Sequence, residues 1–146
     1  MRTMRKMQRG FSLVSAIFLL VVIAALGTFA VTLSTTQQQS AALDVLGARA
    51  YQAARAGIEW GAYQVLPNSA VVGGFAENCR AGATSQVLAP LPNTLSGFNV
   101  NVGCDATAHS EAAATITLYQ LTSTATRGTV ATPDYVERQM TVTIAQ

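Results

Sequence analysis

The chain has 146 residues, of which half are hydrophobic and only 11% are charged. That length allows one globular domain of about 100 residues beside a separate N-terminal segment, and it excludes a large catalytic scaffold. The net charge of +2 is uneven, because four of the nine basic residues precede residue 11. Without residues 1–10 there are five basic and seven acidic side chains, or −2. The remaining basic residues are scattered, so the composition predicts no nucleic-acid partner.

The N-terminal segment is long enough to cross a membrane. No charged side chain occurs between Arg9 and Asp44, and residues 11–33 are predominantly apolar. As a helix this stretch would be about 34 Å long, whereas the hydrocarbon core of a bilayer is about 30 Å thick. The basic residues before it place the N-terminus in the cytoplasm. We therefore expect a single-pass inner-membrane protein with a periplasmic C-terminal domain. An ordinary signal peptide, cut near Ala30, and an uncut signal anchor are the alternatives.

Helical periodicity continues beyond the apolar segment. No proline occurs before Pro67, and small or apolar residues recur every three or four positions, which predicts that residues 34–66 extend the helix. Arg55 and Glu59 are four residues apart and are expected to pair on the exposed surface. Trp60 and Tyr63 are expected to pack against the rest of the domain. The predicted packed face comprises Leu43, Leu46, Ala50, Ala54, Ile58, Gly61 and Val65. Much of it is made of small residues, and its glycines are expected to allow close packing on a sheet or a neighbouring helix. The small residues are Ala50, Ala53, Ala54, Gly57 and Gly61.

Residues 67–146 have the composition of a β-rich globular domain. A loop-rich connection rich in Gly, Asn and Pro is followed by alternating apolar residues over 98–104 and by runs rich in Thr, Val and Ile over 114–125 and 135–145. Alternation of this kind predicts half-buried strands. Gly128 and the residues after it suggest a hairpin loop between the last two strands. The fold class is therefore expected to be α+β, with a long N-terminal helix on a small antiparallel sheet of three or four strands.

The chain offers few residues for chemistry. Cys79 and Cys104 are the only cysteines, and in an oxidising periplasm they are expected to form a disulfide; two free thiols are the alternative. His109 is the only histidine, and its surroundings read as a surface loop. With Asp105 and Glu111 it makes at most a weak cation site. The sequence thus predicts no catalytic residues, no metal site and no cofactor, and we expect a protein that is not an enzyme.

The start of the chain resembles a known export signal. A short basic leader ends at Gly10, Phe11 follows, and the uncharged helix begins directly after it. This order is similar to the class III signal of type IV prepilins and pseudopilins. The resemblance implies that prepilin peptidase cuts between Gly10 and Phe11, removes the cytoplasmic leader 1–10 and methylates the amino group of Phe11. It also implies that residues 11–33 form a transmembrane and assembly helix.

Two further segments extend the resemblance within the pilin-like family. The helical run from Ala53 to Trp60 and the run from Asp134 to Met140 are similar to those of accessory proteins of mannose-sensitive haemagglutinin (MSHA) type IV pili. Major pilins carry a glutamate at the fifth mature position, where this chain has Ser15. The departure implies a minor subunit that initiates assembly or occupies the pilus tip. A single-pass assembly factor and a minor pseudopilin of a type II secretion system are the alternatives.

The implied partners are those of a pilus assembly machine. They are other pilins and minor pilins, which would contact the N-terminal helix, together with prepilin peptidase, the inner-membrane assembly platform and membrane lipid. The helix contains small residues that permit close helix packing in lipid, where packing takes over the role of the hydrophobic drive. These residues are Ser12, Ser15, Ala16, Ala24, Ala25 and Gly27.

Overall fold

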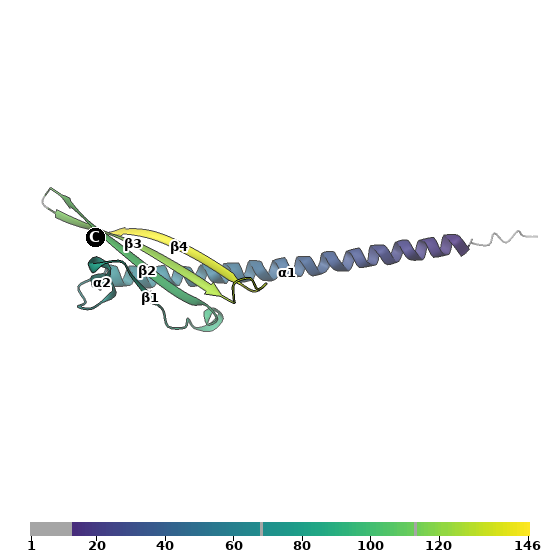
Figure 1. The fold of residues 1–146 in the computed structure, drawn as a ribbon, viewed down its shortest axis with the longest axis horizontal. Helices are drawn as coiled ribbons and strands as arrows, with labels where there is room; N and C mark the ends of the chain where they lie inside the picture. Colours follow the sequence, from purple (N-terminus) through teal and green to yellow (C-terminus); the bar gives the residue numbers. More distant parts are fainter. Residues whose placement is uncertain (1–12, 68, 113) are drawn as a thin grey trace, which may run out of the picture. The chain divides into compact units, whose positions relative to one another are not determined.

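The computed structural model describes residues 13–67, 69–112 and 114–146. It confirms the α+β class: one long helix precedes a four-stranded antiparallel sheet (Figure 1). The chain divides into two compact units, of which the first ends at Ala41 and the second is Ala42–Gln146. The elements in chain order are α1 (Leu13–Val65), α2 (Phe75–Ala81), β1 (Thr84–Val87), the 3-10 turn η1 (Asn93–Leu95), β2 (Asn99–Glu111), β3 (Ala114–Arg127) and β4 (Val136–Ala145).

Helix α1 contributes to both units without interruption. It continues through the Thr-rich stretch around residues 32–36, although β-branched residues lower helix propensity. Each of these threonine hydroxyls donates to a carbonyl oxygen of the preceding turn, such as Thr32 Oγ1 to Phe29 O at 2.8 Å. Helix α1 ends at Val65, one residue before the predicted end, because the residue that precedes a proline is pushed out of the helical region and Pro67 follows Leu66.

The sheet has the strand order β1-β2-β3-β4, and every neighbouring pair is antiparallel. The predicted strands are present, but β2 and β3 are longer than predicted and form one hairpin, in which Asn99 pairs with Thr126 and Glu111 with Ala114. The predicted loop between the last two strands is confirmed, since β3 ends at Arg127 and β4 begins at Val136. Strand β1 was not predicted; four residues are too few for a clear alternation.

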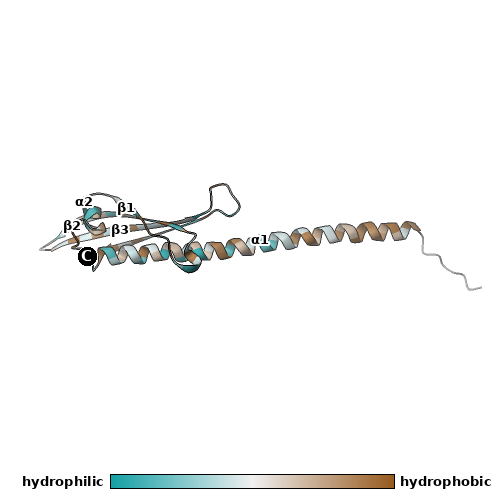
Figure 2. Ribbon diagram, turned by 90° about the horizontal axis from the view of Figure 1, so that it is seen from below, coloured by the Kyte–Doolittle hydropathy of each residue, from teal (hydrophilic) through white to brown (hydrophobic). Residues whose placement is uncertain are grey.

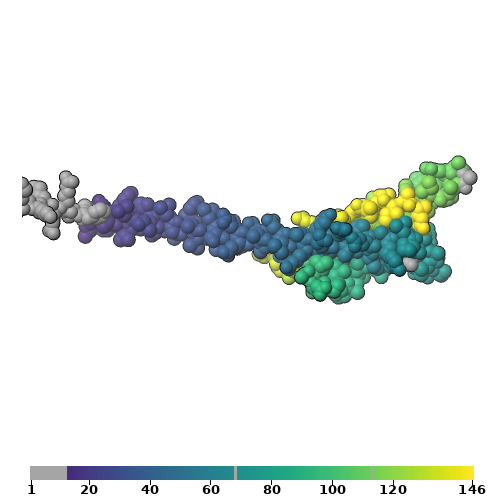
Figure 3. Space-filling model, turned by 180° about the vertical axis from the view of Figure 1, so that it is seen from behind, coloured from purple at the N-terminus to yellow at the C-terminus, as the bar shows by residue number. Residues whose placement is uncertain are grey.

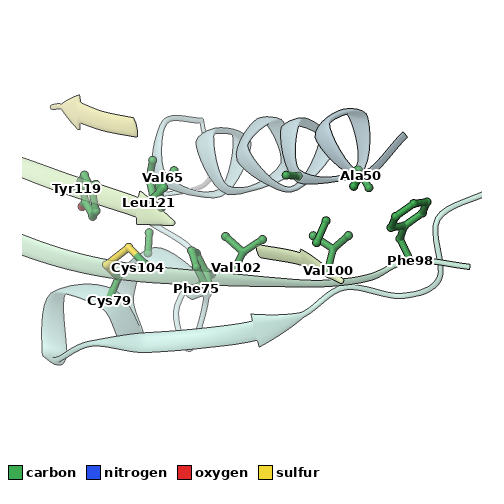
Figure 4. Close-up of a cluster of buried hydrophobic side chains, with 14 residues drawn as sticks. Ala50, Val65, Phe75, Cys79, Phe98, Val100, Val102, Cys104, Tyr119 and Leu121 are labelled. Carbon is green, nitrogen blue, oxygen red and sulfur yellow. A yellow bond between two sulfur atoms is a disulfide. The ribbon is translucent and has the colours of Figure 1, made fainter. Parts of the chain in front are cut away.

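The core lies between one face of the sheet and residues 50–65 of α1 (Figure 4). Alternate residues of β2 and β3 point toward the helix and are buried, whereas the residues between them lie on the opposite face. The buried strand residues include Val100, Val102, Cys104, Tyr119, Leu121 and Ala125. The sheet is therefore covered on one side, as an antiparallel sheet in a two-layer domain should be.

Helix α2 corrects the prediction of an irregular loop after Pro67. Its seven residues are too few to show a helical period, and the Gly-rich sequence before them suggested a turn. Gly74 precedes the helix in an extended conformation. Phe75, Ala76 and Cys79 of α2 are buried, so the short helix is held by packing and by its cysteine rather than by its own propensity.

Candidate functional site

The apolar half of α1 is exposed on all sides. The helix carries no charged residue from Leu13 to Leu43, and its apolar window is not buried anywhere in the protein. Among the described residues α1 is the one helix long and apolar enough to cross a membrane (Figure 2). Its exposed large side chains are Leu13, Val14, Ile17, Phe18, Leu19, Leu20, Val21, Val22, Ile23, Leu26, Phe29, Val31 and Leu33. A helix that is apolar all round requires lipid or other apolar helices around it.

The threonine side chains of this half are hydrogen-bonded within the helix. The hydroxyl of Thr28 donates to Ala25 O at 2.9 Å, and that of Thr36 donates to Thr32 O at 3.0 Å. A hydroxyl with its own backbone acceptor carries a smaller penalty in hydrocarbon than an unpaired one. The threonines are therefore compatible with a position inside or at the edge of a membrane.

The carboxyl half of α1, from residue 42 onward, approaches the sheet closely at Gly57. A Cβ atom at this position would lie 2.2 Å from Ser123 Oγ and 2.8 Å from Val100 Cγ1. One turn later, a Cβ at Gly61 would lie 3.1 Å from Leu121 Cδ1. The prediction that the glycines serve close packing is thus confirmed. Larger residues at these positions would push the helix off the sheet.

The packed face of α1 is largely the predicted one. Its buried residues are Ala50, Ala53, Ala54, Gly57, Gly61 and Val65. Leu43, which was predicted to be packed, is 47% exposed. Tyr63 also contradicts the prediction, since it is 58% exposed, whereas Trp60 is half-buried and its ring contacts Phe75 at 5.0 Å between centroids. The smallest side chains face the sheet because their backbone comes nearest to it.

Ser123 is the one described side chain that is buried and has a polar atom without a hydrogen-bond partner. Its hydroxyl lies directly beneath Gly57 of the helix. Leaving a buried hydroxyl unpaired costs about 1–3 kcal/mol. Serine fits at position 123 because its side chain is small, whereas its unpaired hydroxyl lowers the stability of the domain.

The predicted disulfide between Cys79 and Cys104 is present and joins α2 to β2, with 5.6 Å between the Cα atoms (Figure 4). Next to it, Arg80 donates one hydrogen bond to Tyr119 Oη and another to Ser69 O, both at 2.8 Å. Tyr119 is only 1% exposed. This corner therefore ties α2 and the turn after α1 to the middle of the sheet.

The residues considered for cation binding lie on the outer face of the sheet. His109 is in β2 and pairs with Ile116, so the prediction of a surface loop was wrong. Asp105 and His109 line a shallow hollow of about 220 Å³ with Thr107, Leu118, Gln120 and Thr143. Within the described ranges no group of three or more His, Cys, Asp or Glu side chains gathers in a way that could hold a metal ion.

Two neighbouring groups in the loop before β4 have shifted pKa values. The Tyr135 hydroxyl donates to the Glu137 carboxylate, which raises the pKa of Tyr135 above 10.0. A hydrogen bond from Thr132 lowers the pKa of Asp134 below 3.8, with smaller contributions from its own backbone and from Arg127. Asp134 is exposed and Tyr135 is half-buried. They organise the loop, and nothing about them indicates catalysis.

The predicted processing residues, Gly10 and Phe11, lie outside the residues that the structure describes. Ser15 is described and is exposed in the first turn of α1. Arg55 and Glu59 form the predicted ion pair, at 2.9 Å between Nε and Oε1. Arg138 lies on the edge strand β4. A Cβ atom at Gly47 would lie 3.5 Å from its guanidinium nitrogen Nη2.

Comparison of the chain with known protein families, curated proteins and solved structures found no match.

Proposed function

We propose that this chain is a minor pilin-like subunit for biogenesis of a type IV pilus of the MSHA type, acting in initiation or at the tip. Within the pilin-like family it resembles the MSHA biogenesis protein MshP. The observation that carries the proposal is the division of α1: an uncharged, exposed amino half is continuous with a carboxyl half that packs on an antiparallel sheet. A purely soluble domain has no use for the first half.

The proposed mechanism is associative. Helix α1 holds the protein in the inner membrane, with the leader in the cytoplasm and residues 67–146 in the periplasm. Prepilin peptidase cuts between Gly10 and Phe11 and methylates the new amino terminus. The assembly platform then moves the apolar helix from lipid to the equivalent helices of other pilins. Lipid and the neighbouring helices are both apolar, so the transfer changes the solvation free energy of the helix only slightly. The side-chain packing between helices therefore determines the direction of the transfer.

Ser15 supports a position at the end of a filament. In the pilin-like family, the glutamate at this place neutralises the amino terminus of a neighbouring subunit within an apolar bundle. An unpaired ammonium group in such surroundings is strongly unfavourable. A subunit with Ser15 cannot neutralise a neighbour's amine, and so it suits a tip position, where no further subunit presents one. We expect few copies per pilus.

Mass spectrometry of the N-terminal peptide, from protein recovered from its native membrane, tests the proposal. A methylated Phe11 start supports prepilin processing. A Gly10→Val variant, with its bulkier residue at the cut, should retain the leader, whereas a Thr3→Ala control within the leader should be processed normally. An intact leader in the unmodified protein indicates a permanent signal anchor and an assembly factor. A start near Val31 indicates an ordinary secreted domain and contradicts the proposal.

Quantitative proteomics of sheared filaments tests the copy number. This chain should be present at a small fraction of the abundance of the main subunit. Equal abundance would contradict the tip assignment. Recovery with secretion-system pseudopilins instead of pilins would transfer the chain to a type II secretion machine.

A further inference from the structure

Strand β4 forms an edge of the sheet over ten residues. It pairs with β3 alone, from Leu118–Ala145 to Arg127–Val136, without a bulge in the register. Figure 1 shows β4 as the last strand on its side of the sheet, and in Figure 3 its yellow atoms form an uncovered margin. The opposite edge belongs to β1, which has only four residues.

The hydrogen-bond pattern identifies which backbone groups of β4 are free. Thr117 and Gln146 exchange both of their backbone hydrogen bonds, at 2.7 and 3.0 Å. In an antiparallel pair such exchanges recur at every second residue, so the even-numbered residues of β4 bond to β3. The N–H and C=O groups that point away from the sheet belong to Glu137, Gln139, Thr141, Thr143 and Ala145. In the part of the chain that the structure describes, no turn or loop bonds to them.

This edge lacks the features that usually protect a sheet from further pairing. Natural edge strands are short, bulged, covered, or interrupted by proline or charged residues. Residues 139–145 read Gln-Met-Thr-Val-Thr-Ile-Ala, without a charge, a proline or a glycine. The only charges of β4 are Glu137 and Arg138, close to its start. An uncharged strand of high β-propensity with a free edge is a template for an additional strand.

A symmetric second copy does not fit this edge. A Cβ atom at Gly47 would lie beside Arg138, near the start of β4. A Cβ atom at Gly61 would lie beside Leu121, which pairs with Val142 later in β4. Helix α1 therefore runs in the same direction as β4. Antiparallel pairing of two β4 strands would reverse one α1 relative to the other. The two Ala42 ends would then leave the joined sheet at opposite ends, although both chains must enter one membrane. This step rests on the membrane span of the proposed function.

Other pairings of identical chains are also poor. A two-fold axis along the strands would set N–H groups against N–H groups across the junction. In a head-to-tail arrangement β4 would meet β1 of the next copy. Leu88 N donates to Val100 O, so only Ser85 and Val87 of β1 direct their backbone groups outward. Two residues cannot satisfy an edge of five.

We propose that the outer edge of β4 binds an extended segment of a different protein, which adds a fifth strand to the sheet. The segment has at least five residues and no charge opposite residues 139–145. On the α1 face, Met140, Val142 and Ile144 are half-buried and present apolar surface to a neighbouring strand. The segment therefore carries apolar side chains at alternate positions on this face. Main-chain hydrogen bonds provide affinity, and these side chains provide selection.

The proposal is tested with the full chain in its native membrane. A photoreactive phenylalanine replaces Gln139 on the edge or, as a control, Asn101, which is exposed in the interior strand β2. Irradiation should link position 139, but not 101, to a different chain, at sites that fall within one extended segment. Thr141→Pro deletes an outward N–H without removing a bond to β3, and it should lower the yield at least tenfold. Thr141→Ala keeps that N–H and should leave the yield unchanged.

Amide hydrogen exchange provides a measurement that needs no variant. In the isolated protein the amides of Gln139, Thr141 and Thr143 should exchange faster than those of Met140 and Val142. In the membrane-extracted complex, exchange of the first three should slow at least tenfold. No adduct, an adduct with the mass of two copies only, an adduct insensitive to Thr141→Pro, or unchanged exchange each overturns the proposal. N-terminal processing is read from the same sample: a processed chain without an adduct overturns the edge proposal alone, and an adduct on an unprocessed chain overturns the proposed function alone.

Discussion

Replacement of Gly57 by alanine should destabilise the domain, although alanine is the better helix former. Helix propensity alone favours Gly57→Ala by about 1 kcal/mol. The new Cβ, however, would lie 2.2 Å from Ser123 Oγ and 3.1 Å from Ser123 Cβ. The hydroxyl can rotate away, but the Cβ atom can move only with strand β3. Overpacking of this kind costs about 1–3 kcal/mol. We expect a net loss in the free energy of unfolding of up to about 2 kcal/mol.

Gly47→Ala is the matched control in the same helix. A Cβ at Gly47 would have one neighbour within 4 Å, the mobile end of Arg138 at 3.5 Å. The propensity gain of about 1 kcal/mol should therefore be expressed as increased stability. The two alanine variants should move the urea midpoint of the full chain in detergent micelles in opposite directions. The fluorescence of Trp60, the only tryptophan, reports the transition because its ring contacts Phe75.

Ser123→Ala separates the steric cause from other effects. Alone, it removes the unpaired buried hydroxyl and should stabilise the domain by about 1 kcal/mol. In the Ser123→Ala background, Gly57→Ala should cost at least 0.5 kcal/mol less, at the low end of the coupling found for contacting residues. Equal stabilisation by Gly57→Ala and Gly47→Ala, or a double variant that is simply additive, would refute the close approach of α1 to β3.

Three further predictions follow from the structure. Replacing Cys79 and Cys104 together by serine should lower the free energy of unfolding by about 3 kcal/mol, measured as a shift of the urea midpoint that reductant reproduces in the unmodified chain. Tyr119→Phe removes the acceptor for Arg80 and should cost about 0.5–1.5 kcal/mol, whereas Tyr51→Phe, at an exposed tyrosine, should be neutral in the same assay. Because the pKa of Tyr135 is raised, the contribution of this hydroxyl to stability is present below pH 10 and is lost as the pH rises through the folded-state pKa. Glu137→Gln should return the pKa of Tyr135 toward 10.0 in an absorbance titration. An unchanged titration would exclude the hydrogen bond between Tyr135 and Glu137.

The prediction of His109 in a loop shows where local signals fail. The β2–β3 hairpin turns next to Ala112, whose φ of 52° is a left-handed conformation usually signalled by glycine or asparagine. Without that signal, the alternation of residues 98–104 was not continued to Glu111. Strand pairing over thirteen residues provides the missing stabilisation. A pattern read from a short stretch of sequence does not include the stabilisation from strand pairing, because the partner residues become adjacent only after the turn has formed.

The sequence by itself determined the features that depend on composition and covalent chemistry. The uncharged run before Asp44 needs an apolar environment whatever the fold, and two cysteines have one possible intramolecular pairing. The alternation around Val100 and around Val142 predicted strands, since the period of two is a property of the extended backbone.

Only the tertiary structure decided how far the packed face of α1 extends and which strand remains at the edge. Leu43 and Tyr63 have the hydrophobicity of core residues, yet both are exposed, because the sheet covers only one side of α1 and only from Ala50 to Val65. The free edge of β4 likewise follows from the strand order, which depends on contacts between residues far apart in the chain. Such contacts form only when backbone and side chains are brought together in space, and their free energies are therefore absent from any local reading of the sequence.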